Sequence, residues 1–365
     1  MRVLFDAYWW VDGPPSGASI LRDIVQEWSE SYPEDEIILA IPRRKCDGAN
    51  FEIASNVKVV RTHLRFHPLI NFVELPIMTR LLFRVDAVIA QNFTPFARNS
   101  VTFVHDVLFQ TNPEYFKRDE LLYMSLISRT FRRKAKYMTS SLTERERIMT
   151  KNPKLSNVFV TGLAVSKSLA RVTAVEPNLG LTVNNFILTV GRINTRKNLT
   201  STIEAFLRST ARAEGMRLVI VGEKSGRADA LSQQALQGIH DGSIIMTGYL
   251  RDAQLRWLYE NCALFCFLSL AEGYGLPPSE AAMFGAKIVV SDIDVHRETV
   301  TPDACFVDPL NIDEVRDQID KICRSDDTPS TYPPSKSEDA STGWRGIVDK
   351  IRALASNNAS QELGV

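Results

Sequence analysis

Two glutamates, Glu272 and Glu280, frame a short stretch that contains two glycines and two prolines. Gly273 and Gly275 allow the backbone to approach a ligand closely and to expose its N–H groups. One carboxylate could then accept hydrogen bonds from a sugar and the other from a ribose, with backbone amides between them for phosphates. Two glutamates at this spacing also arise by chance. In that case Glu280 complements a helix dipole and Glu272 is solvated.

Two cations, Arg192 and Lys197, follow an apolar run further upstream. A short turn and a helix that begins near Asn198 or Leu199 would hold both cations beside helix N-terminal amides. Fixed donors and the helix dipole favour anions there, which predicts a phosphate or diphosphate site. The alternative is two surface cations on a loop. The chain has no G-x-x-x-x-G-K-[ST] sequence, so this is not a P-loop.

These residues need elements to position them, and the chain predicts an α/β protein. Near-continuous apolar runs alternate with helix-period segments, which is typical of parallel sheets covered on both faces. We expect two doubly wound, Rossmann-like domains that face a central cleft. The predicted strands are 2–8, 36–41, 57–62, 86–91, 101–106, 137–141, 157–162, 186–192, 217–223, 243–249, 263–269, 287–292 and 304–308.

The predicted boundaries follow changes in composition along the chain. They are a first domain at 1–165, a linker at 166–183, a second domain at 184–325, a flexible connector at 326–342 and a helix at 343–365 that could cross to the first domain. Ligands of open parallel sheets bind beyond the carboxyl ends of the strands. His105 and Asp106 end one predicted strand, Arg192 ends another and Glu272 follows a third, so several of these residues should meet.

Bulk composition excludes some functions. The 43 basic and 43 acidic residues cancel, so no global field would gather nucleic acid. The first residues read as a strand and not as a signal peptide, and no apolar run approaches the roughly 18 residues that span a bilayer. The five cysteines lack paired C-x-x-C spacing, which favours reduced thiols and gives no sign of structural zinc. We expect a cytoplasmic protein.

Two weaker features bear on the acceptor. Tyr8, Trp9 and Trp10 follow the first strand, where they could stack on an acceptor sugar or pack in the core. A basic helix face is also predicted, and it could contact anionic lipid on the inner face of the cytoplasmic membrane, although a solvated face is the more frequent explanation. Its residues are Arg129, Arg132, Arg133 and Lys136.

Several segments carry a resemblance to a known family, and they occur in the family's order. "TGY", "LYENC", the E-x7-E pair and "VVSDIDVHRETV" look like the carboxyl-terminal domain of the retaining family-4 glycosyltransferases, which have the GT-B fold. "VGRINTRKNL" is similar to the family's upstream cationic element. "VHDVLFQTNPEYF" resembles the His-Asp element of bacterial polysaccharide members, many of which are mannosyl- or rhamnosyltransferases. "GPPSGASILRDIV" resembles the Gly-rich first loop, so the likeness covers about residues 1–320.

The resemblance implies roles on the donor side. Arg192 and Lys197 would neutralise the donor diphosphate. Glu272 would bond hydroxyls of the transferred sugar, and Glu280 would hold the ribose. The backbone that assists Glu272 would be that of Gly273, Tyr274, Gly275 and Leu276.

The resemblance also implies roles in the first domain. His105 would contact the donor hexose near the reacting centre, and Gly17 would let the first loop approach the phosphates. Asp106 is a weak candidate for the acceptor side, with Tyr8, Trp9 and Trp10. The catalytic set would therefore be His105, Glu272, Arg192 and Lys197.

The implied activity is a retaining hexosyl transfer that needs no cofactor and no metal, and the sequence shows no D-x-D element placed to bind a divalent cation. Our leading prediction for the donor is GDP-mannose. The predicted acceptor is a glycan or lipid-linked oligosaccharide of a surface polysaccharide resembling O-antigen. Two alternatives remain open: a sugar-nucleotide epimerase on the same fold, and a catalytically inert GT-B binding module. A phosphorylase would need a pyridoxal phosphate lysine pocket, which the sequence does not reveal.

Overall fold

The computed structural model describes residues 1–11, 13–46, 54–324 and 340–356. They form two compact units. Unit 1 comprises Met1–Thr111, Leu121–Ser166 and Glu338–Val365, and unit 2 comprises Asn112–Glu120 and Lys167–Ser337. Most of the connector predicted at 326–342, and the last nine residues of the helix predicted at 343–365, lie outside the described residues.

Unit 1 contains a parallel sheet of seven strands among its described residues, in the order β3-β2-β1-β4-β5-β6-β7. Winding starts at β1 in the middle and proceeds to both edges, which is the doubly wound pattern. The strands are β1 Arg2–Asp6, β2 Glu36–Pro42, β3 Val57–Thr62, β4 Ala87–Gln91, β5 Ser100–Phe103, β6 Lys136–Thr139 and β7 Val158–Val160.

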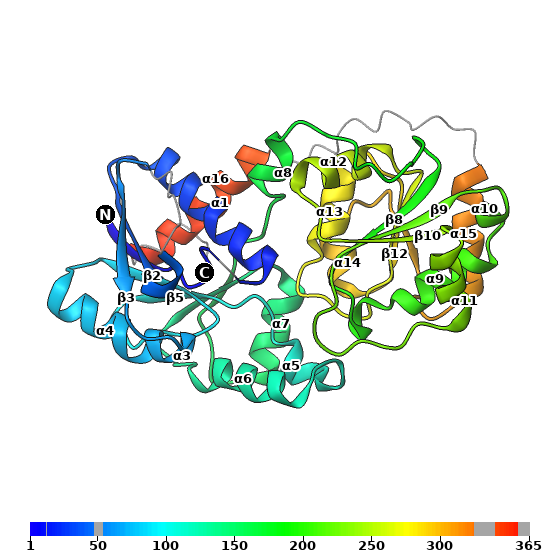
Figure 1. The fold of residues 1–365 in the computed structure, drawn as a ribbon. Helices are drawn as coiled ribbons and strands as arrows, with labels where there is room; N and C mark the ends of the chain where they lie inside the picture. The colour runs from blue at the N-terminus through cyan, green and yellow to red at the C-terminus, as the bar shows by residue number, and fades with distance from the viewer. Residues whose placement is uncertain (12, 47–53, 325–339, 357–365) are drawn as a thin grey trace. The chain divides into compact units, whose positions relative to one another are not determined.

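The last helix of the chain belongs to unit 1 and lies alongside its first helix, as Figure 1 shows for α16 and α1. Trp344 on α16 is fully buried, and its indole N–H donates to the carbonyl oxygen of Val165 at 2.8 Å. Arg352 donates from Nε to the buried carboxylate of Asp35 at 2.8 Å. The unit 1 helices are α1 Pro15–Ser31, α2 Arg43–Cys46, α3 His67–Leu69, η1 Ile70–Glu74, α4 Leu75–Ile77, η2 Met78–Leu82, α5 Leu108–Thr111, α6 Arg118–Arg129 (which begins in unit 2), α7 Leu142–Lys151 and α16 Ala340–Ala355.

Unit 2 contains a parallel sheet in the order β10-β9-β8-β11-β12-β13 within its described part. Its strands are β8 Phe186–Val190, β9 Arg217–Val221, β10 Ile244–Gly248, β11 Leu264–Phe267, β12 Ile288–Ser291 and β13 Cys305–Val307. Its helices are η3 Pro113–Tyr115, α8 Lys167–Arg171, η4 Thr195–Lys197, α9 Leu199–Arg208, α10 Thr210–Ala213, α11 Gln233–His240, α12 Asp252–Asn261, α13 Leu276–Met283, α14 Asp294–Thr299 and α15 Ile312–Arg324. The helix α8 lies inside the stretch predicted as a linker.

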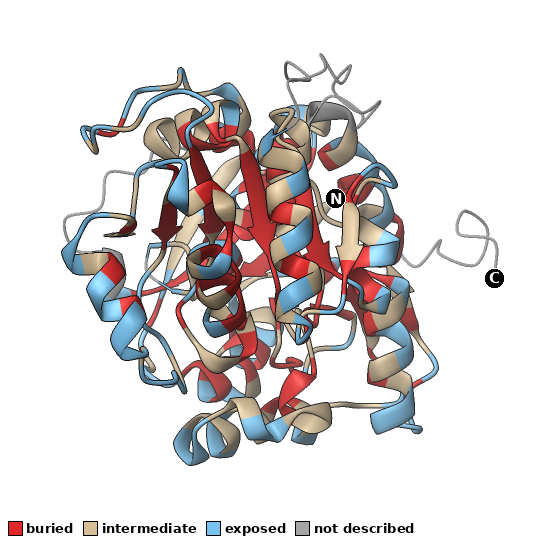
Figure 2. Cartoon of the chain, turned by 90° about the vertical axis from the view of Figure 1, so that its right-hand side faces the viewer, coloured by how far each residue is buried: buried red, intermediate tan, exposed pale blue. Residues whose placement is uncertain are grey.

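Each strand coincides with one that the sequence predicts. The central strands β8 and β11 are almost wholly buried because helices cover both faces of the sheet, and Figure 2 shows the strands coloured as buried. Ligands therefore have access at the strand ends, where loops leave the sheet.

The predicted basic helix face is wrong. The helix α6 ends at Arg129, because the N–H and the hydroxyl of Thr130 both turn back to the carbonyl oxygen of Ile127 at 3.0 and 2.7 Å. Beyond that turn a strand begins, not another helical turn. The four residues Arg129, Arg132, Arg133 and Lys136 consequently occupy a helix end, a connecting turn and the first position of β6.

Candidate functional site

A sharp turn after β8 carries two consecutive cations, Arg196 and Lys197. The side-chain oxygen of Asn194 accepts a hydrogen bond from the Lys197 N–H at 3.1 Å and caps the short turn η4. Asn198 then adopts a left-handed conformation with φ of 50°, and α9 begins at Leu199, where the sequence predicts it. This local geometry turns both cationic side chains toward the loop that follows β11.

Glu272 lies in that loop and binds both cations. Its Oε1 is 2.6 Å from Lys197 Nζ, and its Oε2 is 2.7 Å from Arg196 Nη1. The three side chains are only 9 to 11% exposed. Arg196 also donates to the carbonyl oxygen of Ala271 at 2.5 Å, and Lys197 Nζ lies 4.4 Å from the centre of the Phe267 ring. We call Arg196, Lys197 and Glu272 the ion triad.

The ion triad carries an excess of positive charge. Burial alone would raise the pKa of Glu272, but the charges of Arg196 and Lys197 hold that pKa well below its usual range. Burial lowers the pKa of Lys197 to about 8, with the nearby cations Arg196 and Arg192 acting in the same direction and Glu272 opposing them. One carboxylate thus faces two cations at neutral pH, and the exposed Arg192 adds a third cation nearby. Such a cluster attracts an anion.

The glycine loop brings the second glutamate into the same unit. Gly275 has φ of 90°, in the left-handed region that favours glycine, and α13 starts directly after it at Leu276. Glu280 therefore lies beyond the first turn of α13, which Leu276, the two prolines and Ser279 occupy. The Tyr259 hydroxyl donates to Glu280 Oε2 at 2.7 Å. Burial raises the pKa of Glu280 to about 7.

Two glycines fix the ends of β8 and β9 against each other. A Cβ on Gly222 would lie 2.0 Å from the carbonyl oxygen of Gly191, and Gly222 has φ of 141°. A side chain there would push away the backbone that leads into Arg192 and the turn η4. The close approach explains the glycine at position 222, directly after β9.

His296 is a buried residue of the site region that sequence reasoning missed. It is fully buried, and its Nδ1 lies 3.0 Å from the carbonyl oxygen of Ser291. Its Nε2 has no hydrogen-bond partner among the described residues and lies 3.2 Å from where a Cβ on Gly275 would be. Burial lowers the pKa of His296. Because Nδ1 faces a carbonyl oxygen it is the donor, which in a neutral ring makes Nε2 the acceptor. An added side chain at position 275 would crowd this ring.

In unit 1, His105 follows β5 as predicted. Its Nε2 is 2.6 Å from Gln91 Oε1, and its backbone N–H donates to Asn92 Oδ1 at 3.2 Å. Burial lowers the pKa of His105 to about 4, so the ring is neutral at pH 7. Asp106 accepts a hydrogen bond from the N–H of Leu108 at 3.2 Å and so shapes the start of α5.

Two of the aromatic residues after β1 pack against histidines of unit 1. The Trp9 ring centre is 5.5 Å from that of His105, and Tyr8 stacks on His67 at 4.2 Å. A Cβ on Gly17 would lie 2.8 Å from Trp9, so glycine at that position lets α1 pack on the indole ring. Trp10 accepts a hydrogen bond from Arg22 through its carbonyl oxygen.

Sequence reasoning also missed a buried pair at the end of β1. His67 Nε2 is 2.6 Å from Asp6 Oδ2, which also accepts from the Asn71 side chain at 2.9 Å. The histidine is 61 residues from its partner in sequence, so no local signal could have joined them. Sequence reasoning missed Arg196 as well, although its position next to Lys197 in "TRK" was a signal that could have identified it.

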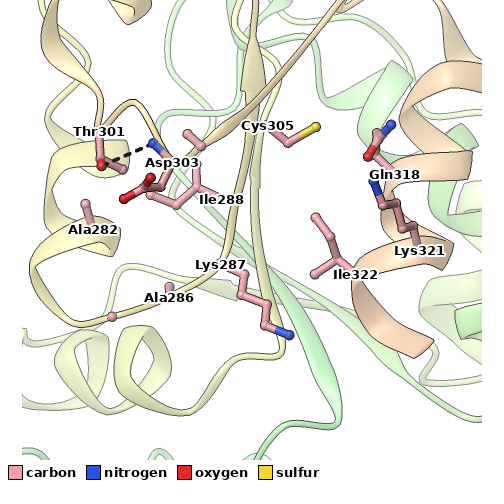
Figure 3. A pocket seen from close by; sticks show the side chains of 12 residues that line it. Ala282, Ala286, Lys287, Ile288, Thr301, Asp303, Cys305, Gln318, Lys321 and Ile322 are labelled. Carbon is pink, nitrogen blue, oxygen red and sulfur yellow. Dashed lines mark hydrogen bonds between the residues drawn. The ribbon is translucent and has the colours of Figure 1, made fainter. Parts of the chain in front are cut away.

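The pocket drawn in Figure 3 is a separate feature of unit 2, with a volume of about 370 Å³. Lys287 precedes β12 and Cys305 starts β13, so the pocket lies at the amino ends of these parallel strands. Glu272 follows the carboxyl end of β11. The pocket is therefore not the place where the ion triad would receive a ligand.

Within the described residues, no three histidine, cysteine, aspartate or glutamate side chains gather in a way that could hold a metal ion. None of the described helices combines the length and the apolar composition that crossing a membrane requires. Burial raises the pKa of the buried thiols of Cys262 and Cys266 to about 12, so both stay protonated.

Comparison with known proteins places this site in context. Residues 177–333 match the family described as "Glycosyl transferases group 1". The chain is 29% identical over 224 residues to O-antigen chain mannosyltransferase B of Escherichia coli, and the match covers 59% of each chain. The matched part is thus less than two thirds of that relative's length.

Solved structures resemble the whole chain at low sequence identity. Sucrose-phosphate synthase from Thermosynechococcus elongatus is 13% identical with a TM-score of 0.65, over 99% of this chain and 98% of that one. Anabaena HepE, solved in complex with UDP and glucose, is 16% identical with a TM-score of 0.59, over 100% of this chain and 99% of that one. These likenesses show the fold, which is GT-B as the sequence predicts.

Proposed function

We propose that the protein transfers a hexose from a nucleotide sugar to a glycan acceptor, because residues 177–333 match the glycosyl transferases group 1 family. The observation that carries this proposal is the ion triad at the carboxyl edge of the unit 2 sheet. It places two cations, a carboxylate and a glycine loop where open parallel sheets bind ligands.

The donor diphosphate would lie against the cations. Lys197 has three N–H donors, of which Glu272 takes one, so others remain for phosphate oxygens. Arg192 is exposed at the end of β8 and adds a planar set of donors. These charges are held in place before the ligand arrives, which is the condition for stabilising a leaving group efficiently.

The two carboxylates would bind the two sugars of the donor. Glu272 would accept hydrogen bonds from hydroxyls of the hexose, as an ionised carboxylate is an acceptor with about four lone-pair positions. Glu280 accepts from Tyr259 on Oε2, and its other acceptor positions would receive the ribose hydroxyls. His105 of unit 1 would contact the hexose near its reacting carbon.

In the transfer, the bond between the anomeric carbon and the diphosphate oxygen breaks, and the oxygen leaves with the electron pair. An acceptor hydroxyl forms the new bond to the same face of the sugar, and its proton passes to an oxygen of the leaving phosphate. The configuration is retained. No residue or metal ion has to supply a nucleophile in this scheme, and the reaction is expected to tolerate EDTA.

For the donor we propose GDP-mannose, and for the acceptor a lipid-linked oligosaccharide of a surface polysaccharide. The support is the similarity to O-antigen chain mannosyltransferase B, at 29% identity over part of each chain. Tyr8, Trp9 and Trp10 stay our prediction for the acceptor side.

The test is a panel of GDP-, UDP-, dTDP- and ADP-sugars with EDTA present, read by thermal shift and by nucleotide release. We expect GDP-mannose to stabilise the wild-type chain and to release GDP slowly. Lys197→Ala should lower the release rate by ~10²–10³, the usual cost of losing one such charged contact. A loss below ten-fold would remove Lys197 from the mechanism.

The control is Glu204→Gln, which removes a carboxylate from α9 that pairs with Arg208 in solvent. It should bind the donor like the wild type, whereas Glu280→Gln should bind it weakly. Binding without any turnover, even with added glycan acceptors, would favour the inert binding module. Conversion of the nucleotide sugar to an isomer would favour the epimerase.

A further inference from the structure

A ridge of exposed apolar side chains runs along the helical segment 67–82 of unit 1. It consists of Leu69, Val73, Ile77 and Leu81, which are 44 to 77% exposed and recur at every fourth position. The segment alternates between α-helix and the wider π-helical turns η1 and η2. Wider turns bring residues four apart nearly above one another, so the apolar side chains form one straight row. We call these four residues the apolar ridge.

The end of the apolar ridge meets an open hollow lined by arginines. The hollow has a volume of about 1000 Å³, and its cations are Arg80, Arg84, Arg98 and Arg132. Among the described residues that line it, Asp86 is the single carboxylate, and this side chain already accepts a hydrogen bond from the backbone N–H of Arg2 at 2.7 Å. We call the four arginines the arginine hollow.

Three of these arginines are placed to bind an anion. Arg80, Arg84 and Arg98 are exposed, and no described carboxylate pairs with any of them. Arg132 is held differently, since it donates to the carbonyl oxygen of Pro95 and to the hydroxyl of Ser100. The hollow therefore combines a fixed guanidinium with three cations that can turn toward an anion.

The arginine hollow lies at the amino ends of the unit 1 strands, and the predicted catalytic histidine lies at their carboxyl ends. Ala87 and Ser100, which line or border the hollow, start β4 and β5. His105 follows the other end of β5. An occupant of the hollow would thus leave the loops at the carboxyl edge of the sheet accessible.

The chemistry of this surface fits a lipid bilayer better than a protein. Guanidinium groups bind phosphates through paired N–H donors. The apolar ridge holds only branched aliphatic residues, whereas the binding energy of protein interfaces is concentrated in tryptophan, tyrosine and arginine, with leucine and valine under-represented. A row of aliphatic side chains beside cations is the pattern of segments that lie in the headgroup region of an anionic membrane.

We propose that unit 1 docks on anionic lipid bilayers, with the arginine hollow binding lipid phosphates and the apolar ridge entering the acyl boundary. This surface replaces the basic helix face that the sequence predicts. The proposal rests on unit 1 alone and holds whether or not the protein transfers a sugar.

The test is flotation of the full chain with vesicles of phosphatidylcholine, alone or mixed with phosphatidylglycerol. We expect binding to the mixed vesicles only, and weaker binding at high salt. Each arginine near an anionic surface is worth about five-fold in partitioning, so Arg80→Gln/Arg84→Gln should bind about 25-fold more weakly. The charge-matched control in unit 2, Lys321→Gln/Arg324→Gln, should bind like the wild type.

The apolar ridge has its own pair of variants. Ile77→Ser/Leu81→Ser should lose binding to the mixed vesicles, whereas Leu236→Ser/Leu310→Ser, which removes two exposed leucines of unit 2, should not. Thermal melting checks that each variant is folded.

Four results would overturn the proposal. The first is wild-type binding that does not depend on phosphatidylglycerol. The second is equal binding by the arginine variant and its control. The third is binding that soluble glycerol phosphate abolishes and that the ridge variant leaves intact, which would identify a soluble phosphate site. A wild-type chain that ignores all vesicles but forms dimers, lost in the ridge variant, would assign the ridge to a second copy instead.

Discussion

Replacing Glu272 by glutamine should destabilise unit 2 strongly, because it leaves two buried cations facing each other. Glutamine keeps the shape and can accept hydrogen bonds, but it removes the charge that balances Arg196 and Lys197. Breaking a buried ion pair by removing one partner costs about 3–5 kcal/mol. The side chains of the triad are about a tenth exposed, so some solvation remains, and we expect about 3 kcal/mol.

Hydrogen exchange of the β8 and β11 backbone in increasing urea measures this cost for unit 2 separately. Glu204→Gln is the matched control, since its partner Arg208 is 55% exposed and such surface pairs contribute about 0.2–1 kcal/mol. Equal effects of Glu272→Gln and Glu204→Gln would refute the reasoning. The apolar triple variant Arg196→Met/Lys197→Met/Glu272→Leu should recover most of the lost stability, because no buried charge is left unpaired.

Three further predictions concern other parts of the structure. Gly222→Ala should lower the free energy of thermal unfolding by about 3 kcal/mol or more, because its Cβ would meet backbone at 2.0 Å. Gly242→Ala is the control, since its Cβ would meet open space at φ of 79°, and it should cost about 1 kcal/mol. Similar costs for the two variants would contradict the crowding argument. The carboxylate of Glu280 forms as pH rises through about 7, so calorimetry should find that the wild type binds the donor more weakly below that pH. Glu280→Gln should bind the donor weakly at every pH. A wild-type affinity that does not change with pH would exclude the Glu280 carboxylate from donor binding. Arg352→Ala should lower the unfolding free energy of unit 1 by about 2 kcal/mol, because Asp35 stays buried without its guanidinium partner. Urea denaturation measures this change. An unchanged unfolding free energy would mean that the pair contributes nothing to the stability of unit 1.

The sequence predicts the strands well because each is a short, strongly apolar run, and burial on both faces leaves little ambiguity. Helix ends are harder. Nothing in the composition around Thr130 marks the end of α6, because the signal is a side chain that bonds back to the Ile127 carbonyl oxygen. A helical period drawn past that residue puts Lys136 on a helix, although the structure places it in β6.

In the candidate site, too, some features follow from the local sequence and others do not. The placement of Lys197 and Glu272 near strand ends follows from the alternation of strands and helices. The pairing of Arg196 with Glu272 depends on the left-handed Asn198 and the capped turn before it, which bring residues 76 positions apart within 2.7 Å. Local sequence carries no information about such a partner. His296 was missed for the same reason, since its burial against the Gly275 loop is a tertiary property.

The return of α16 to unit 1 sets an order for the protein's synthesis. A ribosome that has made the first 166 residues must still translate unit 2 before it reaches α16, which takes roughly ten to thirty seconds at usual elongation rates. During that interval α1 lacks the helix that covers it, and Asp35 lacks Arg352. Unit 2, by contrast, is almost continuous in sequence and can fold as soon as it emerges. Nascent chains halted before α16 should therefore be recognised by chaperones and proteases through unit 1 and not through unit 2.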